Sequence, residues 1–298
     1  MSALPPSVDE EVRAVLRGKR LGSDIRDVHA MLGGCINRGV RIETDAGQKL
    51  FLKWNLEAPP DMFTAEADGL TALAATQTVR VPEPIACGGE KIVWLVMEYV
   101  KPGAMGPDAE VRLGRALAQL HATGQGVRFG WHRDNFIGSL PQTNARETSW
   151  SEFWTTRRIV PQLEAARTRG YASDRIFDRL IPMIPAALVD VTEPQLLHGD
   201  LWSGNCYAAE DGSPVLVDPA VYHGHGEVDL AMTELFGGFG PRFYAAYAEA
   251  SGPQDAYEAY RRELYQLYYL LVHVNLFGPS YEPGAVRAAR EVVSALSG

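Results

Sequence analysis

The chain has 298 residues, of which 46% are hydrophobic and 22% charged, and its formal net charge at pH 7 is -9. This composition is ordinary for a globular protein, and the length suits one large domain or two lobes. The negative charge argues against a general nucleic-acid-binding protein, which would present a basic face. No apolar stretch approaches the roughly 20 residues of a membrane helix and no leader-like run opens the chain, so we expect a cytoplasmic protein with neither a nucleic-acid nor a membrane partner.

The first hundred residues predict a small lobe built on an antiparallel sheet. Apolar spacing and alternation predict a helix over 8–20, strands over 25–31, 39–44 and 49–54, a helix over 60–75, and strands over 81–85 and 91–100. The segment 101–107 is rich in Pro and Gly and predicts the boundary between residues 1–100 and residues 101–298. Beyond it, helices are predicted over 108–121, 150–169, 173–187, 228–236, 242–250, 257–277 and 283–296. The predicted fold class is therefore α+β, with a small antiparallel-sheet lobe before a larger, mostly helical lobe.

A glycine-rich segment, 33–39, lies between two predicted strands and is a candidate phosphate-binding loop. Gly33, Gly34, Cys35 and Asn37 would let backbone N–H groups approach a phosphate without obstruction by bulky side chains. The segment lacks the G-x4-G-K-[ST] pattern of a Walker loop, and a plain hairpin turn remains the alternative. None of the three cysteines, Cys35, Cys87 and Cys206, predicts a disulfide or zinc site.

Lys53 ends the strand after this loop, where a protein-kinase-like fold places the lysine that binds the α- and β-phosphates of ATP. Lys49 lies on the same strand face but nearer the turn, as an exposed strand lysine would. Glu66 on the following helix is the natural ion-pair partner of Lys53, with Asp68 as the alternative. At the end of the apolar strand, the backbone of Glu98, Tyr99 and Val100 would face the adenine.

The most informative stretch is His198-Gly199-Asp200-Leu201-Trp202-Ser203-Gly204-Asn205, followed by Val217-Asp218-Pro219-Ala220. In a kinase catalytic loop, an Asp accepts the proton of the attacking hydroxyl, while an Asn and a later Asp hold the metal ions of the nucleotide. Asp200 is therefore the candidate base, and Asn205 and Asp218 are the candidate Mg2+ ligands. Asp and Asn are also common in plain turns, but here an apolar strand precedes the loop and another delivers Asp218. His198 is predicted to be a packed scaffold residue.

Taken together, these motifs resemble the fructosamine kinases, or ketosamine 3-kinases, which share the protein-kinase-like fold of aminoglycoside phosphotransferases. The resemblance covers nearly the whole chain. Its other motifs are Gly33-Gly34-Cys35-Ile36-Asn37, Phe63-x-x-Glu66-x-x-Gly69-Leu70, residues 78–82, Met97-Glu98-Tyr99, Asp134-Asn135-Phe136-Ile137-Gly138, Asp229-Leu230-Ala231-Met232, residues 235–239 and residues 264–267. The resemblance implies a bilobal kinase that uses ATP and Mg2+ to phosphorylate the 3-hydroxyl of a ketosamine, either a small molecule or a glycated protein. The unstable product then releases the free amine, which is deglycation.

The resemblance also implies roles for single residues. Trp202 and His273 match family positions that hold the sugar, although both could instead be core residues. Asp229 is expected to brace the catalytic loop, and Cys35 matches a loop position that can act as a redox switch, including by linking two chains as a dimer. The chain departs from familiar members at Gly226 and Leu276, which leaves the substrate pocket open to variation.

Two rival interpretations remain. A phosphotransferase acting on an aminoglycoside or another small alcohol would use the same loop chemistry, since a fold does not fix its acceptor. A pseudokinase would bind nucleotide without turnover. A protein kinase is disfavoured because Asp218-Pro219-Ala220 stands in place of D-F-G.

Overall fold

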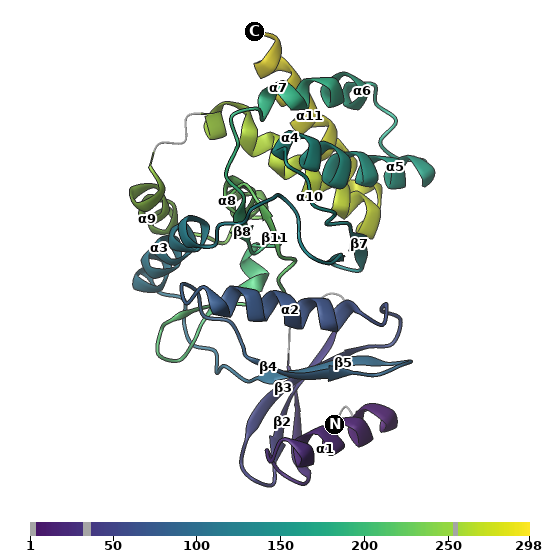
Figure 1. Cartoon of the computed structure of the whole chain (residues 1–298), viewed down its shortest axis with the longest axis vertical. Coiled ribbons are helices and arrows are strands. Elements are labelled where there is room, and N and C mark those ends of the chain that lie inside the picture. Colours follow the sequence, from purple (N-terminus) through teal and green to yellow (C-terminus); the bar gives the residue numbers. More distant parts are fainter. Residues whose placement is uncertain (1–3, 32–36, 253–255) are drawn as a thin grey trace. The chain divides into compact units, whose positions relative to one another are not determined.

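The computed structural model describes residues 4–31, 37–252 and 256–298, which fold into two compact units (Figure 1). The first unit holds Met1–Met105 together with Cys206–Asp218, and the second holds Gly106–Asn205 together with Pro219–Gly298. The chain thus adds a short hairpin to the first unit before it returns to the second. A single division after residue 100, as predicted from the sequence, does not describe this return.

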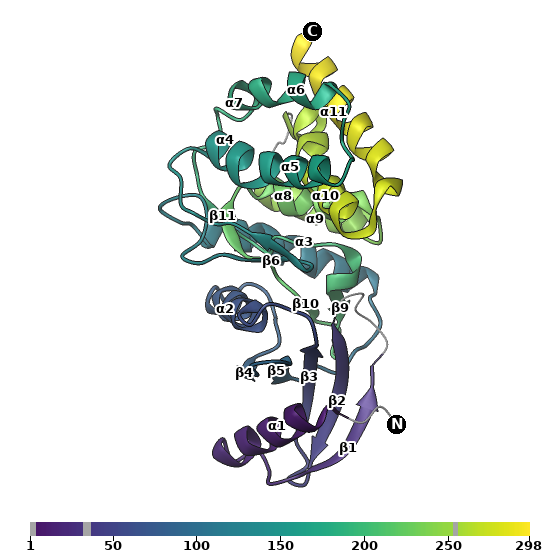
Figure 2. The ribbon, with the colours of Figure 1, turned by 90° about the vertical axis from the view of Figure 1, so that its right-hand side faces the viewer.

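The first unit is built on a five-stranded antiparallel sheet in the order β1-β2-β3-β5-β4. Its strands are β1 (Ile25–Ala30), β2 (Arg38–Thr44), β3 (Lys49–Asn55), β4 (Pro84–Gly88) and β5 (Val93–Glu98). They confirm the predicted antiparallel lobe. Helices α1 (Pro6–Gly18) and α2 (Met62–Ala75) lie on opposite faces of the sheet (Figure 2).

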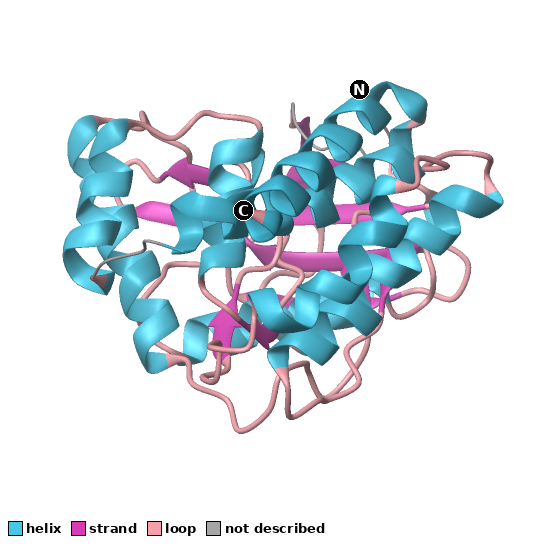
Figure 3. Ribbon diagram, turned by 90° about the horizontal axis from the view of Figure 1, so that it is seen from above, coloured by secondary structure: helices cyan, strands magenta, loops and turns pink. Residues whose placement is uncertain are grey.

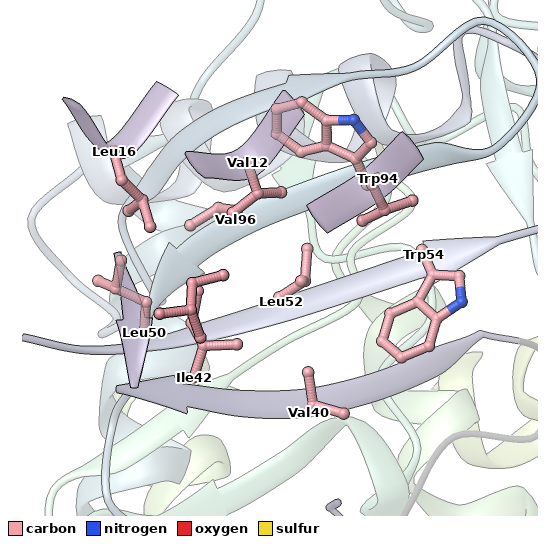
Figure 4. Close-up of a cluster of buried hydrophobic side chains, with 11 residues drawn as sticks. Val12, Leu16, Val40, Ile42, Leu50, Leu52, Trp54, Trp94 and Val96 are labelled. Atoms are coloured by element: carbon pink, nitrogen blue, oxygen red, sulfur yellow. The ribbon is translucent and has the colours of Figure 1, made fainter. Parts of the chain in front are cut away.

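Alternation along the strands decides which side chains meet which helix. Val12 and Leu16 of α1 pack with Leu52, Trp94 and Val96 in one buried apolar cluster (Figure 4). Because successive strand residues point to opposite faces, Lys53 is directed away from α1 and toward α2.

The hairpin of β9 (Cys206–Ala208) and β10 (Pro214–Leu216) completes the first unit. Val215 packs with Val100 and Ala209 in a second buried cluster, and Gly103 N–H donates to the Ala208 carbonyl at 2.7 Å. The hairpin therefore lies beside the end of β5 and the segment that follows it.

The second unit is mostly helical, as predicted, and helices (cyan in Figure 3) supply most of its regular structure. Its helices are α3 (Pro107–Thr123), α4 (Trp150–Phe153), α5 (Val160–Thr168), α6 (Ile176–Leu180), α7 (Ile184–Ala187), α8 (Glu227–Leu235), α9 (Pro241–Ser251), α10 (Arg262–Phe277) and α11 (Glu282–Ser297). Two short hairpins accompany them: β6 (Asn135–Ile137) with β7 (Leu140–Gln142), and β8 (Gln195–Leu197) with β11 (Tyr222–Gly224).

Two of the predicted helices, 150–169 and 173–187, are interrupted, and a third, 257–277, begins with a π-helical turn, Tyr257–Arg261. A π-helical turn, Trp154–Ile159, separates α4 from α5 just before Pro161, and a 3-10 turn, Ile181–Met183, separates α6 from α7. Proline has no backbone N–H to continue an α-helix, and Pro161, Pro182 and Pro185 stand at these breaks. No helix within the described ranges has both the length and the apolar character needed to cross a membrane.

Candidate active site

Lys53 on β3 is the centre of a buried charge cluster in the first unit. Its side chain is 4% exposed, and Nζ lies 2.5 Å from Glu66 Oε1 and 2.8 Å from Asp218 Oδ1. The Phe63 ring, 5.4 Å from Nζ, covers the ammonium further. The structure thus brings together three residues that the sequence singled out, from β3, α2 and the end of the β9–β10 hairpin. Lys49, the alternative on the same strand, is exposed.

The cluster shifts the pKa values of both partners in the Lys53–Glu66 pair. Burial alone would lower the pKa of Lys53, but the carboxylates of Asp218 and Glu66 outweigh it and raise the net value. Burial also raises the pKa of Glu66 to about 7, against the opposing effect of Lys53. Lys53 therefore stays charged at neutral pH, as a phosphate-binding group requires.

The candidate phosphate loop is only partly described. Gly33, Gly34 and Cys35 lie outside the described residues. Asn37 is described, and its Oδ1 accepts a hydrogen bond of 2.9 Å from Asn55 Nδ2 at the end of β3. This bond ties the exit of the loop to the strand that carries Lys53.

The segment Glu98–Val100 lies beside a residue that the sequence analysis missed, Tyr207 of β9. The Tyr207 hydroxyl donates to the Val100 carbonyl at 3.2 Å, and burial raises the pKa of Tyr207 to about 12. The Glu98 carboxylate is paired with Arg80 at 3.1 Å, and the Glu98 N–H donates to the Glu83 carbonyl at 2.8 Å. The one available signal for Tyr207 was an aromatic residue just beyond Asn205.

In the second unit, strand pairing fixes the catalytic loop. β8 ends at Leu197, which pairs with Tyr222 of β11, and the Ala220 N–H donates to the His198 carbonyl at 2.8 Å. Gly199 has φ +82°, and a Cβ there would collide with the Ala220 carbonyl oxygen. Only glycine fits this backbone conformation and this close approach.

Asp229 anchors the same loop from α8. Its side chain is fully buried and accepts hydrogen bonds from the backbone N–H groups of His198 at 2.7 Å and Gly199 at 2.8 Å. His121 Nε2 lies 3.3 Å from the same carboxylate. His198 is also fully buried, and its Nδ1 accepts from the Asp200 N–H at 3.3 Å. This geometry fits the bracing role expected of Asp229 and the scaffold role expected of His198.

Asp200 and Asn205 are joined directly. Asn205 Nδ2 donates to the Asp200 carbonyl at 2.9 Å and to Asp200 Oδ2 at 3.1 Å. Since the amide nitrogen is directed at Asp200, the amide oxygen is directed away from it and can serve as a ligand. The Trp202 ring packs against Gly204, where a Cβ would collide with the indole.

His273 on α10 lies within a cluster of aromatic rings. The rings of Phe236, Phe277 and Tyr281 lie 4.6, 5.3 and 5.0 Å from its imidazole. Phe236 and Phe277 are 40% and 49% exposed. Burial lowers the pKa of His273, and its Nδ1 lies 2.8 Å from the Tyr269 carbonyl, so Nδ1–H donates and Nε2 is left as an acceptor. The position is thus an open aromatic surface and not a sealed core.

The oxygen donors of the site suit a hard cation. Within residues 4–31, 37–252 and 256–298, no group of three or more His, Cys, Asp or Glu side chains could hold a metal by itself. Mg2+ is usually held by one or two carboxylates together with substrate phosphates. Asp218 offers a half-exposed carboxylate and Asn205 offers an amide oxygen, and each is a hard oxygen donor.

Comparisons with known proteins concern the chain as a whole. The fructosamine kinase family model matches residues 9–295. A probable ketoamine kinase of Synechocystis sp. is 44% identical over 90% of this chain and 90% of its own, and a chloroplastic protein-ribulosamine 3-kinase of Arabidopsis thaliana is 39% identical over 95% and 88%. A solved candidate fructosamine-3-kinase from Haemophilus somnus is 28% identical, with a TM-score of 0.84 over 94% of this chain and 96% of its own. An aminoglycoside phosphotransferase solved with ADP and hygromycin B, 15% identical with a TM-score of 0.57 over 98% of both chains, shares the fold.

Proposed function

This chain belongs to the fructosamine kinase family, and from that membership and the site geometry we propose that it transfers the γ-phosphoryl group of ATP to the 3-hydroxyl of ketosamines. The acceptors are ribulosamine or fructosamine adducts, as small molecules or on glycated proteins. The relative from Arabidopsis thaliana is named for ribulosamines on protein. The ketosamine 3-phosphate is unstable and releases the amine, so the reaction serves deglycation.

Each proposed role follows from one residue's environment. Asp200 accepts the proton of the 3-hydroxyl as that oxygen attacks the γ-phosphorus and ADP leaves. Lys53, held by Glu66, contacts the α- and β-phosphates. Asn205 Oδ1 and the Asp218 carboxylate would hold Mg2+, which neutralises charge on the triphosphate when bound.

The nucleotide and the sugar are assigned to separate sets of residues. The backbone of Glu98, Tyr99 and Val100 would contact the adenine, and Gly33, Gly34, Cys35 and Asn37 would approach the phosphates. Trp202 offers an indole face to the C–H surface of the sugar, and His273 offers Nε2 as an acceptor for a sugar hydroxyl. Cytoplasmic location and a dimer linked through Cys35 stay predictions of the sequence.

The single observation that carries the proposal is the Asp200–Asn205 pair, on a loop anchored by Asp229 and Ala220. Asp200→Asn keeps the shape of the loop but removes the proton acceptor. We expect nucleotide binding to persist while kcat falls by about 10²–10⁴-fold.

The assay couples ADP release to product mass spectrometry over a panel of ribulosamines, fructosamines and aminoglycosides. Phosphorylation of ketosamines at O3 by the wild type supports the proposal, and transfer only to aminoglycosides would support the rival acceptor class. Nucleotide binding without any turnover would identify a pseudokinase. Near-normal kcat in Asp200→Asn would remove Asp200 from its role.

A further inference from the structure

A buried hydrogen-bond network holds the backbone that follows Asp218. Asn135 Nδ2 donates to the Val221 carbonyl at 2.8 Å, and Gln142 Nε2 donates to the Ala220 carbonyl at 3.3 Å. The side chains come from the hairpin β6–β7, and the two residues are 4% and 2% exposed. The Asp134–Gly138 motif is thus connected to the segment that carries a candidate metal ligand.

Each amide in this network has one possible orientation. Asn135 Oδ1 accepts from Gln142 Nε2 at 2.8 Å and from Asn144 Nδ2 at 2.9 Å, so a flipped Asn135 would set donors against donors. The far ends are fixed as well, because the Tyr268 hydroxyl donates to Gln142 Oε1 at 2.6 Å and Arg158 donates to Asn144 Oδ1 at 2.7 Å. The donor directed at Val221 is therefore held in place by its neighbours.

The backbone of Asp218 needs such an anchor. Its φ is +53°, in the left-handed region that residues other than glycine rarely occupy. A conformation of this kind persists only where the surrounding structure holds it. Two residues later, the Ala220 peptide is bonded on one side to His198 and on the other to Gln142. These bonds fix the path along which the chain leaves Asp218.

We propose that Asn135 is a positioning residue that sets the direction of the Asp218 carboxylate toward its metal, acting through Val221 with the help of Gln142 and Asn144. This inference rests on the proposed function, which makes Asp218 a ligand of Mg2+. Partners that orient a metal ligand from outside the coordination shell typically change metal affinity or activity about 10–100-fold when they are mutated.

The test is Asn135→Asp, which keeps the size of the side chain and its two accepting contacts but replaces the donor that faces Val221 with an oxygen. Binding of a fluorescent ADP analogue is titrated with Mg2+ and again with EDTA, so that no turnover is required. We expect the Mg2+-dependent affinity to fall about 10–100-fold while the affinity in EDTA is unchanged. In the coupled assay, kcat should fall with KM for the ketosamine unchanged.

Asn275→Asp is the matched control, because Asn275 is 2% exposed and its Nδ2 donates to the carbonyl and Oε1 of Gln162, at 2.9 and 2.8 Å. Here too the substitution replaces an amide donor with an oxygen, which then faces a backbone carbonyl and a side-chain oxygen of α5. We expect it to lower thermal stability without changing Mg2+-dependent nucleotide affinity. An Asn135→Asp variant that behaves in the same way would overturn the positioning role.

Tyr268→Phe keeps the test decisive if Asn135→Asp does not fold. It removes only the hydroxyl that fixes Gln142 and keeps the ring in place. We expect a loss of Mg2+-dependent affinity in the same direction as for Asn135→Asp, and no loss would overturn the inference. A wild type that shows no Mg2+-dependent nucleotide binding would instead refute the proposed function, so the two failures are distinguishable.

Discussion

Replacing Asp229 by asparagine tests how the catalytic loop is held. One carboxylate accepts the backbone N–H groups of both His198 and Gly199, and the two bonds use different oxygens. An amide has only one oxygen. In either orientation of the substituted side chain, one N–H keeps an acceptor and the other faces an NH2 group.

The free-energy cost follows from this count. A buried N–H left without a partner costs about 1–3 kcal/mol, and the remaining bond loses about 1 kcal/mol when its acceptor is no longer charged. We therefore expect Asp229→Asn to lower the free energy of unfolding by about 2–4 kcal/mol. Asp200 follows Gly199 directly, so displacement of the loop should also lower kcat, by up to about 10²-fold.

The measurement is urea unfolding, with linear extrapolation to water, beside the coupled kinase assay. Asp178→Asn is the control, since Asp178 is 57% exposed and its pair with Arg167 lies at the surface. Such a pair contributes about 0–1 kcal/mol. If Asp229→Asn were no less stable than Asp178→Asn and kept its kcat, the bracing role of Asp229 would be wrong.

Three further predictions concern the pH response, a glycine and a cysteine. The pKa of Glu66 is about 7 in the folded chain against an ordinary 4.5, so between these pH values the folded state binds a proton that the unfolded state has lost. The free energy of unfolding of the wild type should therefore fall relative to that of Glu66→Gln as pH rises from about 4.5 to 7. Urea unfolding of both proteins across that window measures this, and a constant difference between their free energies of unfolding would contradict it. Gly199→Ala should lower the thermal stability of the chain more than Gly170→Ala. The two glycines have similar φ angles, +82° and +84°, but only at position 199 would the added Cβ collide with Ala220. Equal losses of stability would refute the steric argument. Mild peroxide should inactivate the wild type reversibly but spare Cys35→Ala, because burial raises the pKa of the Cys206 thiol to about 12 and keeps that thiol unreactive. Activity and non-reducing gels follow the oxidation, and equal inactivation of both proteins would exclude Cys35 as the redox switch.

Local patterns predicted much of the first unit and of the catalytic loop. Period-two alternation in β2 and in the first half of β3 reflects strands whose faces meet different environments, so it can be read without knowing the partners. β5 is instead a continuous apolar run, as expected of a strand that is buried along its length. The short spacing from Asp200 to Asn205 likewise keeps both residues on one turn of chain, where a direct hydrogen bond forms.

Local patterns alone left open several questions that depended on long-range contacts. Alternation placed Lys49 and Lys53 on the same strand face, and it took the packing of α2 against the sheet to bury Lys53 beside Glu66. Local patterns also could not predict that the β9–β10 hairpin joins the first unit, because the hairpin contacts residues about a hundred positions earlier in the chain.

By itself, the sequence determined the α+β fold class and the family, and it placed the candidate catalytic residues on one loop, because the motifs behind these inferences are residue types at short, fixed spacings. Only the tertiary structure decided that Asn135 bonds to Val221, 86 residues away, that Tyr207 bonds to Val100, and that His273 lies among partly exposed aromatic rings. A side-chain amide or hydroxyl can bond to any backbone group that the folded chain brings within about 3 Å. Its partner is therefore set by how the chain returns on itself, which no local pattern specifies.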